Sequence, residues 1–489
     1  MARASTASKQ RLDWRIAVAF AALLAILFYL LVSAAVFRIG FPLDDTWIHL
    51  TYARNFAEHG EWAFRLGESS AGSTAPLWTL LLSIGYFLNL APYFWTFFLG
   101  WLVLTALGIS AENVARKLIH SYKPQYPWAG VFFVFAWHLT WAAVSGMETL
   151  LHGLFVFVIL ASLMVGTRRY LALGILVGLS VWIRPDGLTL LGPVLFTAFF
   201  VESSWSARGK AMLKIIMGFG TLFLFYLLFN LALSGSPFPN TYYSKQAEYE
   251  EVWLSKTLTE RLVDYLLPIF VSPFVALVPG VYLWAMTVIR LRNWGALAGA
   301  VWFLSYVAIY YMRLPAYQHG RYIIPALPIL YLYGMLGFLE FVTSSPSGKR
   351  IVFVWQSLLG VFCLAFTFVG ARQYANDVSW IETQMVETSK WIRQNLPPDA
   401  LLAVHDIGAV GYFTDHRLLD LAGLVSPEVV PFIRDEPQLA EYLDANSADY
   451  LITLPSFYPI LTSGKEPLYI GSYQSQPVVG ERMAIYHWR

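Results

Sequence analysis

The sequence predicts an α-helical polytopic membrane protein with about eleven transmembrane helices, followed by a small α/β domain outside the membrane. Hydrophobic residues make up 57% of the 489 residues and charged residues only 13%, about half the charged share of soluble domains. Long apolar runs recur from residue 16 to residue 370. Beyond residue 370 they give way to alternating helix and strand patterns.

The apolar runs are each close to the length of about 20 residues that crosses a bilayer as a helix. The first follows a basic N-terminal segment and is longer than the apolar region of a signal peptide, which favours an uncleaved first helix. The predicted spans lie near residues 16–38, 92–114, 126–144, 148–166, 170–184, 185–201, 211–233, 263–290, 294–312, 322–342 and 350–370.

Basic residues fall in alternate connecting loops, which orients the spans. By the positive-inside rule these loops and the N-terminus are cytoplasmic, so the protein is predicted to lie in the inner membrane with its C-terminal domain periplasmic. The intervening loops, 39–91, 145–149, 184–186, 234–262 and 313–321, then face outward. The basic residues are Arg116, Lys117, Lys123, Arg168, Arg169, Arg208, Lys210, Lys214, Arg290, Arg292, Lys349 and Arg350.

The apolar segment 76–90 does not fit as a further span. A crossing there would reverse every later loop, and the segment is short, so we expect an interfacial helix within the outer loop 39–91. The chain therefore divides into a transmembrane module, 1–370, and an outer domain, 371–489. In that domain we expect a helix over Trp380–Asn395 and strands at Leu401–Val404, Tyr450–Thr453 and Met483–Trp488.

Several classes of function are disfavoured by what the sequence lacks. A net charge of +2 without a dominant basic face argues against nucleic acid as a partner. The single cysteine, Cys363, allows no intrachain disulfide and no thiolate metal cluster. No Walker loop or dinucleotide fingerprint occurs. His405-Asp406 and Asp415-His416 lie close in sequence, but they are weak indicators of a metal, and we predict no metal site.

The first outer loop carries an acidic pair, Asp44-Asp45, at the mouth of the first span. A helix beginning there would place Asp45 and His49 on one face. An outward carboxylate in a sheltered cleft can act as a general base toward a sugar hydroxyl. Alternatively, Asp44 caps the helix and Asp45 complements its dipole. The spacing favours neither interpretation, and Arg54 follows one turn further on.

Other polar groups also gather at outer span ends. Glu148 stands in Ser145-Gly-Met-Glu148, a pattern typical of a helix capping box, although a capping carboxylate can still face a cleft. Arg184 stands at a hard break and could bind a lipid-linked phosphate, pair with Asp186 or extend to the interface. The same alternatives apply to Arg313, His319 and Arg321 in a later outer loop. Another outer loop, with Tyr242 and Lys245, adds hydrogen-bonding and stacking groups.

Taken together, these motifs resemble the GT-C-fold glycosyltransferases that use polyprenyl-phosphate sugars. The nearest resemblance is to bacterial proteins similar to terminal arabinofuranosyltransferases, and a more distant one is to protein O-mannosyltransferases. The similar segments run in order along nearly the whole chain: Asp44-Asp45, Arg54-Asn55, Gly60, Gly67-Glu68, Ser73–Trp78, Ser145–Thr149, Arg184–Gly187, Pro239–Tyr243, Gly320–Tyr322, His405–Tyr412 and Asp420–Pro427.

The resemblance implies transfer of one sugar from a polyprenyl-phosphate donor to an extracytoplasmic glycan or other hydroxyl acceptor, with inversion and a role in cell-wall biogenesis. Asp44 or Asp45 would be the general base. No cofactor is required; a divalent metal could bridge the carboxylates and phosphate but is not predicted. The predicted substrate-binding residues are His49, Arg54, Glu148, Arg184, Tyr242, Lys245, His319 and Arg321.

Two departures from the family pattern lie near the expected sugar site. Relatives often carry Gly-Tyr-Thr or similar where this chain has Ala71–Thr74, and Ala-Tyr where it has Thr46-Trp47. The resemblance therefore does not distinguish arabinofuranose, mannose or another sugar. Three alternatives remain open: a transporter or flippase of lipid-linked glycans, a polymerase or ligase that uses a lipid-diphosphate glycan, and a non-catalytic membrane scaffold that binds glycans.

Overall fold

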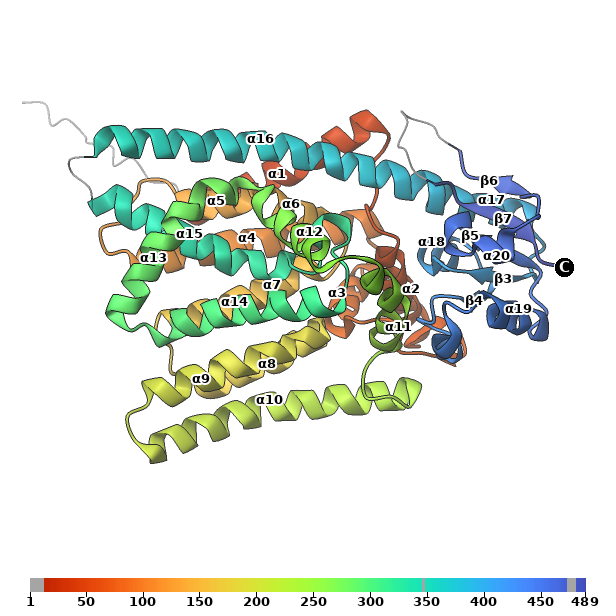
Figure 1. The fold of residues 1–489 in the computed structure, drawn as a ribbon, viewed down its shortest axis with the longest axis horizontal. Coiled ribbons are helices and arrows are strands. Elements are labelled where there is room, and N and C mark those ends of the chain that lie inside the picture. Colours follow the sequence, from red (N-terminus) through yellow and green to blue (C-terminus); the bar gives the residue numbers. More distant parts are fainter. Residues whose placement is uncertain (1–12, 345–347, 473–480) are drawn as a thin grey trace, which may run out of the picture.

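The computed structural model describes residues 13–344, 348–472 and 481–489. It is a long helical bundle with a small sheet domain at one end (Figure 1). Among the described residues, seven helical segments are long and apolar enough to cross a membrane, and four shorter apolar helices accompany them. The chain is therefore a multi-pass membrane protein. The basic segment expected before the first span lies largely outside the described residues.

The bundle begins with α1 (Trp14–Val36), α2 (Asp45–His59) and α3 (Pro76–Phe87), with the short hairpin β1 (Ala63–Arg65) and β2 (Glu68–Ser69) between the last two. It continues through α4 (Pro92–Leu118), α5 (Trp128–Phe135), α6 (Trp137–Val144), α7 (Thr149–Met164), α8 (Tyr170–Ile183), η1 (Pro185–Leu190), α9 (Leu191–Val201) and α10 (Trp205–Ser234). The next elements are α11 (Asn240–Ser255), α12 (Leu258–Phe270), η2 (Pro273–Leu277), α13 (Val278–Leu291), α14 (Trp294–Arg313), η3 (Gln318–Gly320), η4 (Ile324–Ala326), α15 (Leu327–Ser344) and α16 (Lys349–Ile381).

The predicted span 263–290 is wrong as a single helix. A capping box formed by Thr257 and Glu260 starts α12, and α12 ends at Phe270, two residues after Pro268. Ser272 and Pro273 then begin a 3-10 turn that leads into α13. The predicted span 126–144 is likewise two helices, α5 and α6, because Ala136 between them is extended. The count of eleven spans thus remains a prediction.

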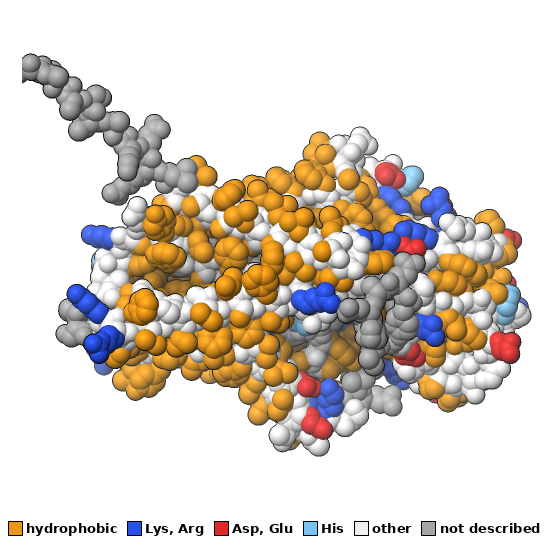
Figure 2. Space-filling model, turned by 90° about the horizontal axis from the view of Figure 1, so that it is seen from above, with side chains coloured by type: hydrophobic (Ala, Val, Ile, Leu, Met, Phe, Trp, Pro, Cys, Tyr) orange, Lys and Arg blue, Asp and Glu red, His pale blue; other side chains and the backbone are white. Residues whose placement is uncertain are grey.

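The helix α3 has 12 residues, a length of roughly 18 Å that is too short to cross the hydrocarbon core. It packs against α2 and α4 at the end of the bundle that carries the sheet domain. Figure 1 places the α7–α8 and α13–α14 connections and the starts of α10 and α16, which carry predicted cytoplasmic residues, at the opposite end. Figure 2 shows a wide hydrophobic band with Lys and Arg at that far end, and further charged residues toward the sheet domain. The cytoplasmic position of the far end remains a prediction.

Glycines allow a close approach of the backbones of α13 and α15. A Cβ at Gly280 would overlap the carbonyl of Gly334, and a Cβ at Gly337 would overlap that of Gly280. Small residues that let backbones approach are typical of helix packing in membranes. The helix α15 is buried along its apolar window, whereas α16 faces outward over most of its length. The core of the bundle therefore forms around α15.

The C-terminal domain is a five-stranded mixed sheet in the order β4-β3-β5-β7-β6. The strands β4, β3 and β5 are parallel, while β7 is antiparallel to β5 and to β6. The elements are η5 (Glu382–Val386, a π-helical turn), α17 (Glu387–Asn395), β3 (Leu401–Val404), α18 (Ile407–Phe413), β4 (Arg417–Asp420), η6 (Pro427–Phe432), α19 (Glu436–Ala445), β5 (Tyr450–Thr453), η7 (Pro455–Phe457), α20 (Pro459–Thr462), β6 (Tyr469–Ile470) and β7 (Ala484–His487).

The three predicted strands of this domain are present, and the domain has its own apolar core. The predicted boundary between residues 370 and 371 lies inside α16, which continues unbroken to Ile381. The sheet domain is thus joined to the bundle by one continuous helix. Arg38, just after α1, reinforces this connection through ion pairs of 2.6 Å with Glu382 and with Glu387.

Candidate active site

A cavity of about 480 Å³ opens among the helix ends that face the sheet domain, and we call it the α2–α14 cavity. Segments far apart in the sequence contribute to it: the start of α2, the turn before α7, the break at η1, the helix α11 and the end of α14. Four cationic and three carboxylate side chains line it. These charged residues are Arg184, Lys245, Arg313, Arg321, Asp45, Glu148 and Asp186.

Asp45 is the first residue of α2 and faces this cavity. Its Oδ2 lies 2.9 Å from a terminal guanidinium nitrogen of Arg321 and 3.9 Å from Nζ of Lys245. Burial alone would raise the pKa of Asp45, but Arg321 and Lys245 outweigh burial and hold that pKa below its ordinary value. The two cations thus keep the carboxylate ionised and fixed in position. Because the Asp45 side chain is 30% exposed, the carboxylate is reachable from the cavity.

Asp44 points elsewhere, and this corrects the expectation that both acidic residues share one pocket. Its two carboxylate oxygens accept hydrogen bonds from the backbone N–H groups of Gly408, at 2.7 Å, and Ala409, at 2.8 Å. These groups form the N-terminus of α18, where a carboxylate is favoured by the unpaired donors. Asp44 therefore docks the sheet domain onto the first outer loop and does not line the α2–α14 cavity.

A second set of charges forms a network around Arg184. The guanidinium lies 2.9 Å from Oε1 of Glu148 and 3.2 Å from Oδ1 of Asp186. Tyr306 and Tyr310 each donate a hydrogen bond of 2.6 Å to the other oxygen of Asp186. The two carboxylates thus hold the Arg184 side chain, and the two phenols hold Asp186 in turn. Arg184 is only 14% exposed, and its orientation toward the cavity is fixed.

His49 connects the two sets of charges. Its Nε2 lies 3.5 Å from Oε2 of Glu148, while its Nδ1 lies 3.2 Å from the hydroxyls of Ser73 and of Thr79. His49 is one helical turn after Asp45, so both residues face the cavity from α2, as their spacing predicts. Glu148 has no side-chain cap hydrogen bond in α7, so the expected capping box is not formed.

The structure brings together seven of the predicted site residues. Arg54 and His319 do not join them: the Arg54 guanidinium stacks 4.7 Å from the Tyr412 ring centroid and donates to the Tyr412 carbonyl, whereas His319 pairs with Asp377 at 2.8 Å. Both contacts lie away from the α2–α14 cavity. The residues that line it are Asp45, His49, Glu148, Arg184, Tyr242, Lys245 and Arg321.

Sequence reasoning missed the tyrosines Tyr306, Tyr310 and Tyr322. The Tyr310 and Tyr322 rings stack at 5.6 Å, and both line the cavity. Tyr306 and Tyr310 stand four residues apart in an apolar span, where aromatic residues are common. This spacing puts both phenols on one face of the helix, and a buried phenol needs a hydrogen-bond partner. The pair was therefore the available sequence signal for a polar site beside this span.

Several apolar residues of the cavity lining come from η1, from the loop before α11 and from the end of α14. They are Leu188, Phe238, Ile309 and Leu314. Leu188 and Ile309 are also exposed on the outside of the helical bundle. Charged groups combined with apolar groups in one cavity suit a lipid-linked ligand.

The histidines considered as weak metal ligands have other partners. His405 lies 3.3 Å from Oε1 of Glu248 and 2.8 Å from the hydroxyl of Tyr458. His416 lies 3.0 Å from the carbonyl of Pro397. Within the part of the chain that the structure describes, no three His, Cys, Asp or Glu side chains are grouped as metal ligands would be.

Comparisons with known proteins define the class of fold. The solved structure of ArnT from Cupriavidus metallidurans bound to undecaprenyl phosphate matches with a TM-score of 0.60 at 13% sequence identity, covering 96% of this chain and 98% of ArnT. The apo structure of ArnT matches equally. The oligosaccharyltransferase of Archaeoglobus fulgidus, in a complex with zinc and sulfate, matches with a TM-score of 0.60 at 12% identity, covering 90% and 67% of the two chains.

The chain therefore has a GT-C fold, as the resemblance predicted. A family model described as a domain of unknown function, DUF8728, matches residues 373–486, which include the end of α16 and the whole sheet domain. No curated protein matches the sequence.

Proposed function

We propose that this protein is a membrane glycosyltransferase that moves one sugar from a polyprenyl-phosphate donor to the hydroxyl of an extracytoplasmic glycan or similar acceptor. The observation that carries the proposal is the convergence of Asp45, Arg184 and Arg321 in one cavity. These residues come from segments far apart in the chain, and each costs free energy to place near lipid. Structures of ArnT, which has the same fold, include one bound to undecaprenyl phosphate.

The cationic side chains suit the donor phosphate. Arginine can give two parallel hydrogen bonds to phosphate oxygens, and lysine adds a point charge. Arg321 and Lys245 lie beside Asp45, and Arg184 lies in the neighbouring network. The four cationic side chains outnumber the three carboxylates, so the cavity carries a net positive charge to receive an anion. The polyprenyl chain would leave along Leu188, Ile309 and Leu314 toward the bilayer.

Asp45 is the general base of the proposed reaction. The acceptor oxygen forms a bond to the anomeric carbon, the bond from that carbon to the phosphate oxygen breaks, and the acceptor proton passes to the Asp45 carboxylate. The polyprenyl phosphate leaves with the bonding electrons, and one displacement inverts the anomeric configuration. Arg321 and Lys245 lower the pKa of Asp45. When the donor is bound, these two side chains would pair with its phosphate instead, and the basicity of the Asp45 carboxylate would rise.

No metal or nucleotide is required by this scheme, because the phosphate leaving group is stabilised by side chains of the chain itself. The sheet domain would hold or orient the acceptor glycan, since Leu424 from that domain lines the cavity. Neither the sugar nor the acceptor is assigned. A cell-wall role and arabinofuranosyl or mannosyl transfer stay predictions from the resemblance.

The test compares two neighbouring carboxylates in the purified, reconstituted protein. Labelled polyprenyl-phosphate sugars are offered with glycan acceptors, and Asp45→Asn is measured beside Asp44→Asn. We expect Asp45→Asn to lower transfer by about 100-fold or more, and Asp44→Asn to act mainly on stability. Full activity in Asp45→Asn would remove the proposed base. Transfer only from diphosphate-linked oligosaccharides would favour the polymerase or ligase alternative, and movement of donor without transfer would favour a flippase.

A further inference from the structure

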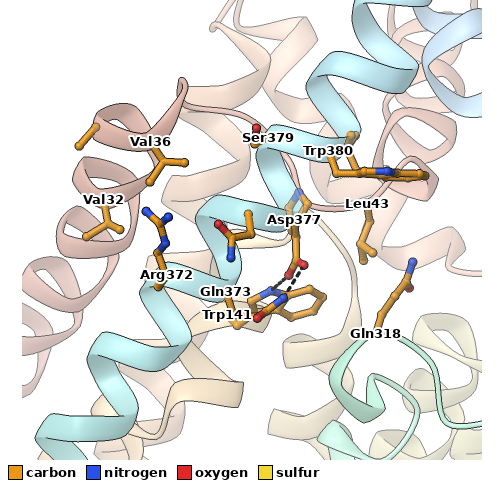
Figure 3. Close-up of a pocket in the computed structure, with 14 residues that line it drawn as sticks. Val32, Val36, Leu43, Trp141, Gln318, Arg372, Gln373, Asp377, Ser379 and Trp380 are labelled. Atoms are coloured by element: carbon orange, nitrogen blue, oxygen red, sulfur yellow. Dashed lines mark hydrogen bonds between the residues drawn. The ribbon is translucent and has the colours of Figure 1, made fainter. Parts of the chain in front are cut away.

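A second cavity, of about 750 Å³, lies on the other side of the turn that carries Arg321. We call it the α1–α16 cavity, because α1 forms its apolar wall through Val32 and Val36, and α16 forms its polar wall. Figure 3 shows these two walls facing each other, with Trp141 and Gln318 below them. None of the residues of the proposed transfer site lines this space.

The cavity lies at the level of the bilayer surface. Its apolar wall belongs to the last turns of α1, which ends at Val36. Its polar wall begins at Arg372 of α16, a helix that starts at Lys349 in the basic end of the bundle. At 1.5 Å per residue the helix rises roughly 35 Å between these two residues, slightly more than the hydrocarbon thickness of about 30 Å. Arg372 is therefore at headgroup height.

The one carboxylate in the cavity is already satisfied. Asp377 accepts a hydrogen bond of 3.0 Å from Nε1 of Trp141 and one of 3.1 Å from Nε2 of Gln373 (Figure 3). Its Oδ2 also lies 2.8 Å from Nε2 of His319. Three donors converge on this side chain from three elements. Asp377 thus acts as a fixed part of the cavity floor, and its carboxylate oxygens are engaged by donors of the protein itself.

Other polar groups of this cavity have no partner. Among residues 13–344, 348–472 and 481–489, the side chains of Arg372, Asn376 and Gln318 make no hydrogen bond or ion pair. The guanidinium is a strong bidentate donor for phosphate oxygens, and the amide of Asn376, one turn along the same helix, adds a further donor. The unmatched charge is positive, and it stands opposite an apolar wall that can take a hydrocarbon chain.

We propose that the α1–α16 cavity binds the phosphate group of an anionic membrane lipid. The phosphate oxygens bind Arg372 and Asn376, and a hydrocarbon chain of the lipid lies against Val32 and Val36 of α1. This site is separate from the proposed donor site and does not depend on the proposed function. The lipid is either a bulk phospholipid or a polyprenyl phosphate, which share this headgroup chemistry.

The two cavities share the turn Tyr317–Tyr322. His319 and Gln318 adopt left-handed backbone conformations, with φ of 63° and 46°, which non-glycine residues rarely adopt. On one side the turn is held by the contact of His319 with Asp377, and on the other by the ion pair of Arg321 with Asp45. A lipid at Gln318 therefore lies against the same turn that positions Arg321.

The test is a lipid titration of the full-length protein followed by native mass spectrometry. The probes are phosphatidylglycerol, phosphatidylcholine and a polyprenyl phosphate, each added to detergent-purified protein. Arg372→Gln removes the cation, and Asn376→Asp places a negative charge in the cavity. The matched control is Arg393→Gln, an exposed arginine further along the same helical run and outside both cavities.

We expect Arg372→Gln to weaken the tightest phosphatidylglycerol binding by about tenfold, the effect of losing one charge-assisted contact. Asn376→Asp should weaken it as well, and Arg393→Gln should not. To separate the two lipid sources, Arg372→Gln is also made in an Arg321→Ala background. If this double variant loses the tightest binding of polyprenyl phosphate, that lipid is the natural source. If its binding of polyprenyl phosphate is unchanged, the natural source is the phospholipid. Equal affinity for phosphatidylglycerol and phosphatidylcholine, or unchanged binding in Arg372→Gln, would overturn the proposal.

Discussion

The α2–α14 and α1–α16 cavities lie on either side of one turn of the chain, but they differ in how their charged side chains are paired. In the first, Asp45 is paired with Arg321, and Arg184 stands between Glu148 and Asp186. In the second, Arg372 has no partner among the described residues. A ligand that binds Arg321 or Arg184 in the first cavity must rearrange existing ion pairs, whereas a ligand of the second meets Arg372, which is already free.

This difference indicates two kinds of site. Paired charges are oriented in advance, and the rearrangement that a ligand causes can be used in a reaction, as we propose for Asp45. An unpaired cation at headgroup height favours simple binding of an anion, with no rearrangement. Variants of the paired and of the unpaired residues can separate these two behaviours.

The largest effect on stability is expected for Arg184→Met. This change leaves Glu148 and Asp186 without their shared cation in a largely buried network, which costs about 3–5 kcal/mol. Thermal unfolding in detergent, followed by intrinsic fluorescence, measures it. The comparison variant Arg372→Gln should change stability by no more than about 0.5 kcal/mol. Similar losses in both variants would contradict the distinction between the two cavities.

A smaller loss is expected where Asp44 docks the sheet domain. A Cβ at Gly408 would overlap the carbonyl oxygen and the carboxylate of Asp44, so Gly408→Ala should cost about 1–3 kcal/mol. Limited proteolysis should then release the sheet domain more readily. Gly360→Ala is the matched control, because a Cβ there meets only open space. If the two variants are cleaved equally, Asp44 does not dock the domain as described.

Arg321→Ala should raise the donor concentration that supports half-maximal transfer by about tenfold, the effect of one lost charge-assisted contact. The requirement for acceptor should change less, because the removed group binds phosphate in our scheme. Arg321→Lys should restore part of the donor affinity, and Arg393→Gln should resemble the wild type. An equal change in both substrate requirements would argue that Arg321 supports the cavity generally.

The smallest effect concerns the contact between α11 and the sheet domain. Burial acts to lower the pKa of His405, but the adjacent Glu248 and Asp406 outweigh it and raise that pKa above its ordinary value, with Arg434 opposing them. This contribution to stability is complete below about pH 6.5 and is lost as the pH rises through the folded-state pKa. We expect a loss of about 1 kcal/mol or less, absent in His405→Gln. Thermal unfolding between pH 6 and pH 9 tests this.

Features with a local cause were predictable from the sequence. The helix α1 and the strands β3, β5 and β7 follow from the lengths and periodicities of their apolar residues. The break of the predicted span 263–290 also had a local signal, because Pro268, Ser272 and Pro273 are break and cap residues that hydropathy averaging hides. The predicted boundary between residues 370 and 371 lies inside α16, because this helix continues after its composition becomes polar.

The candidate site was predictable only in part, because its pairs are set by tertiary contacts. Asp44 and Asp45 are adjacent and chemically alike in the sequence. They diverge because α18, more than 360 positions away, supplies two N–H groups to the first, and Arg321 binds the second. His319 was expected with Arg321, but the left-handed turn that contains His319 lets its side chain pair with Asp377, away from the α2–α14 cavity.

The central claim is that the charged groups of the α2–α14 cavity receive the phosphate of a lipid donor. A cryo-EM structure of the protein with a polyprenyl phosphate bound tests it most directly. We predict phosphate density within hydrogen-bonding distance of Arg321 and either Arg184 or Lys245, with the Asp45 carboxylate no longer paired to Arg321. Density for the phosphate at Arg372 alone, with the pair of Asp45 and Arg321 intact, would contradict the account.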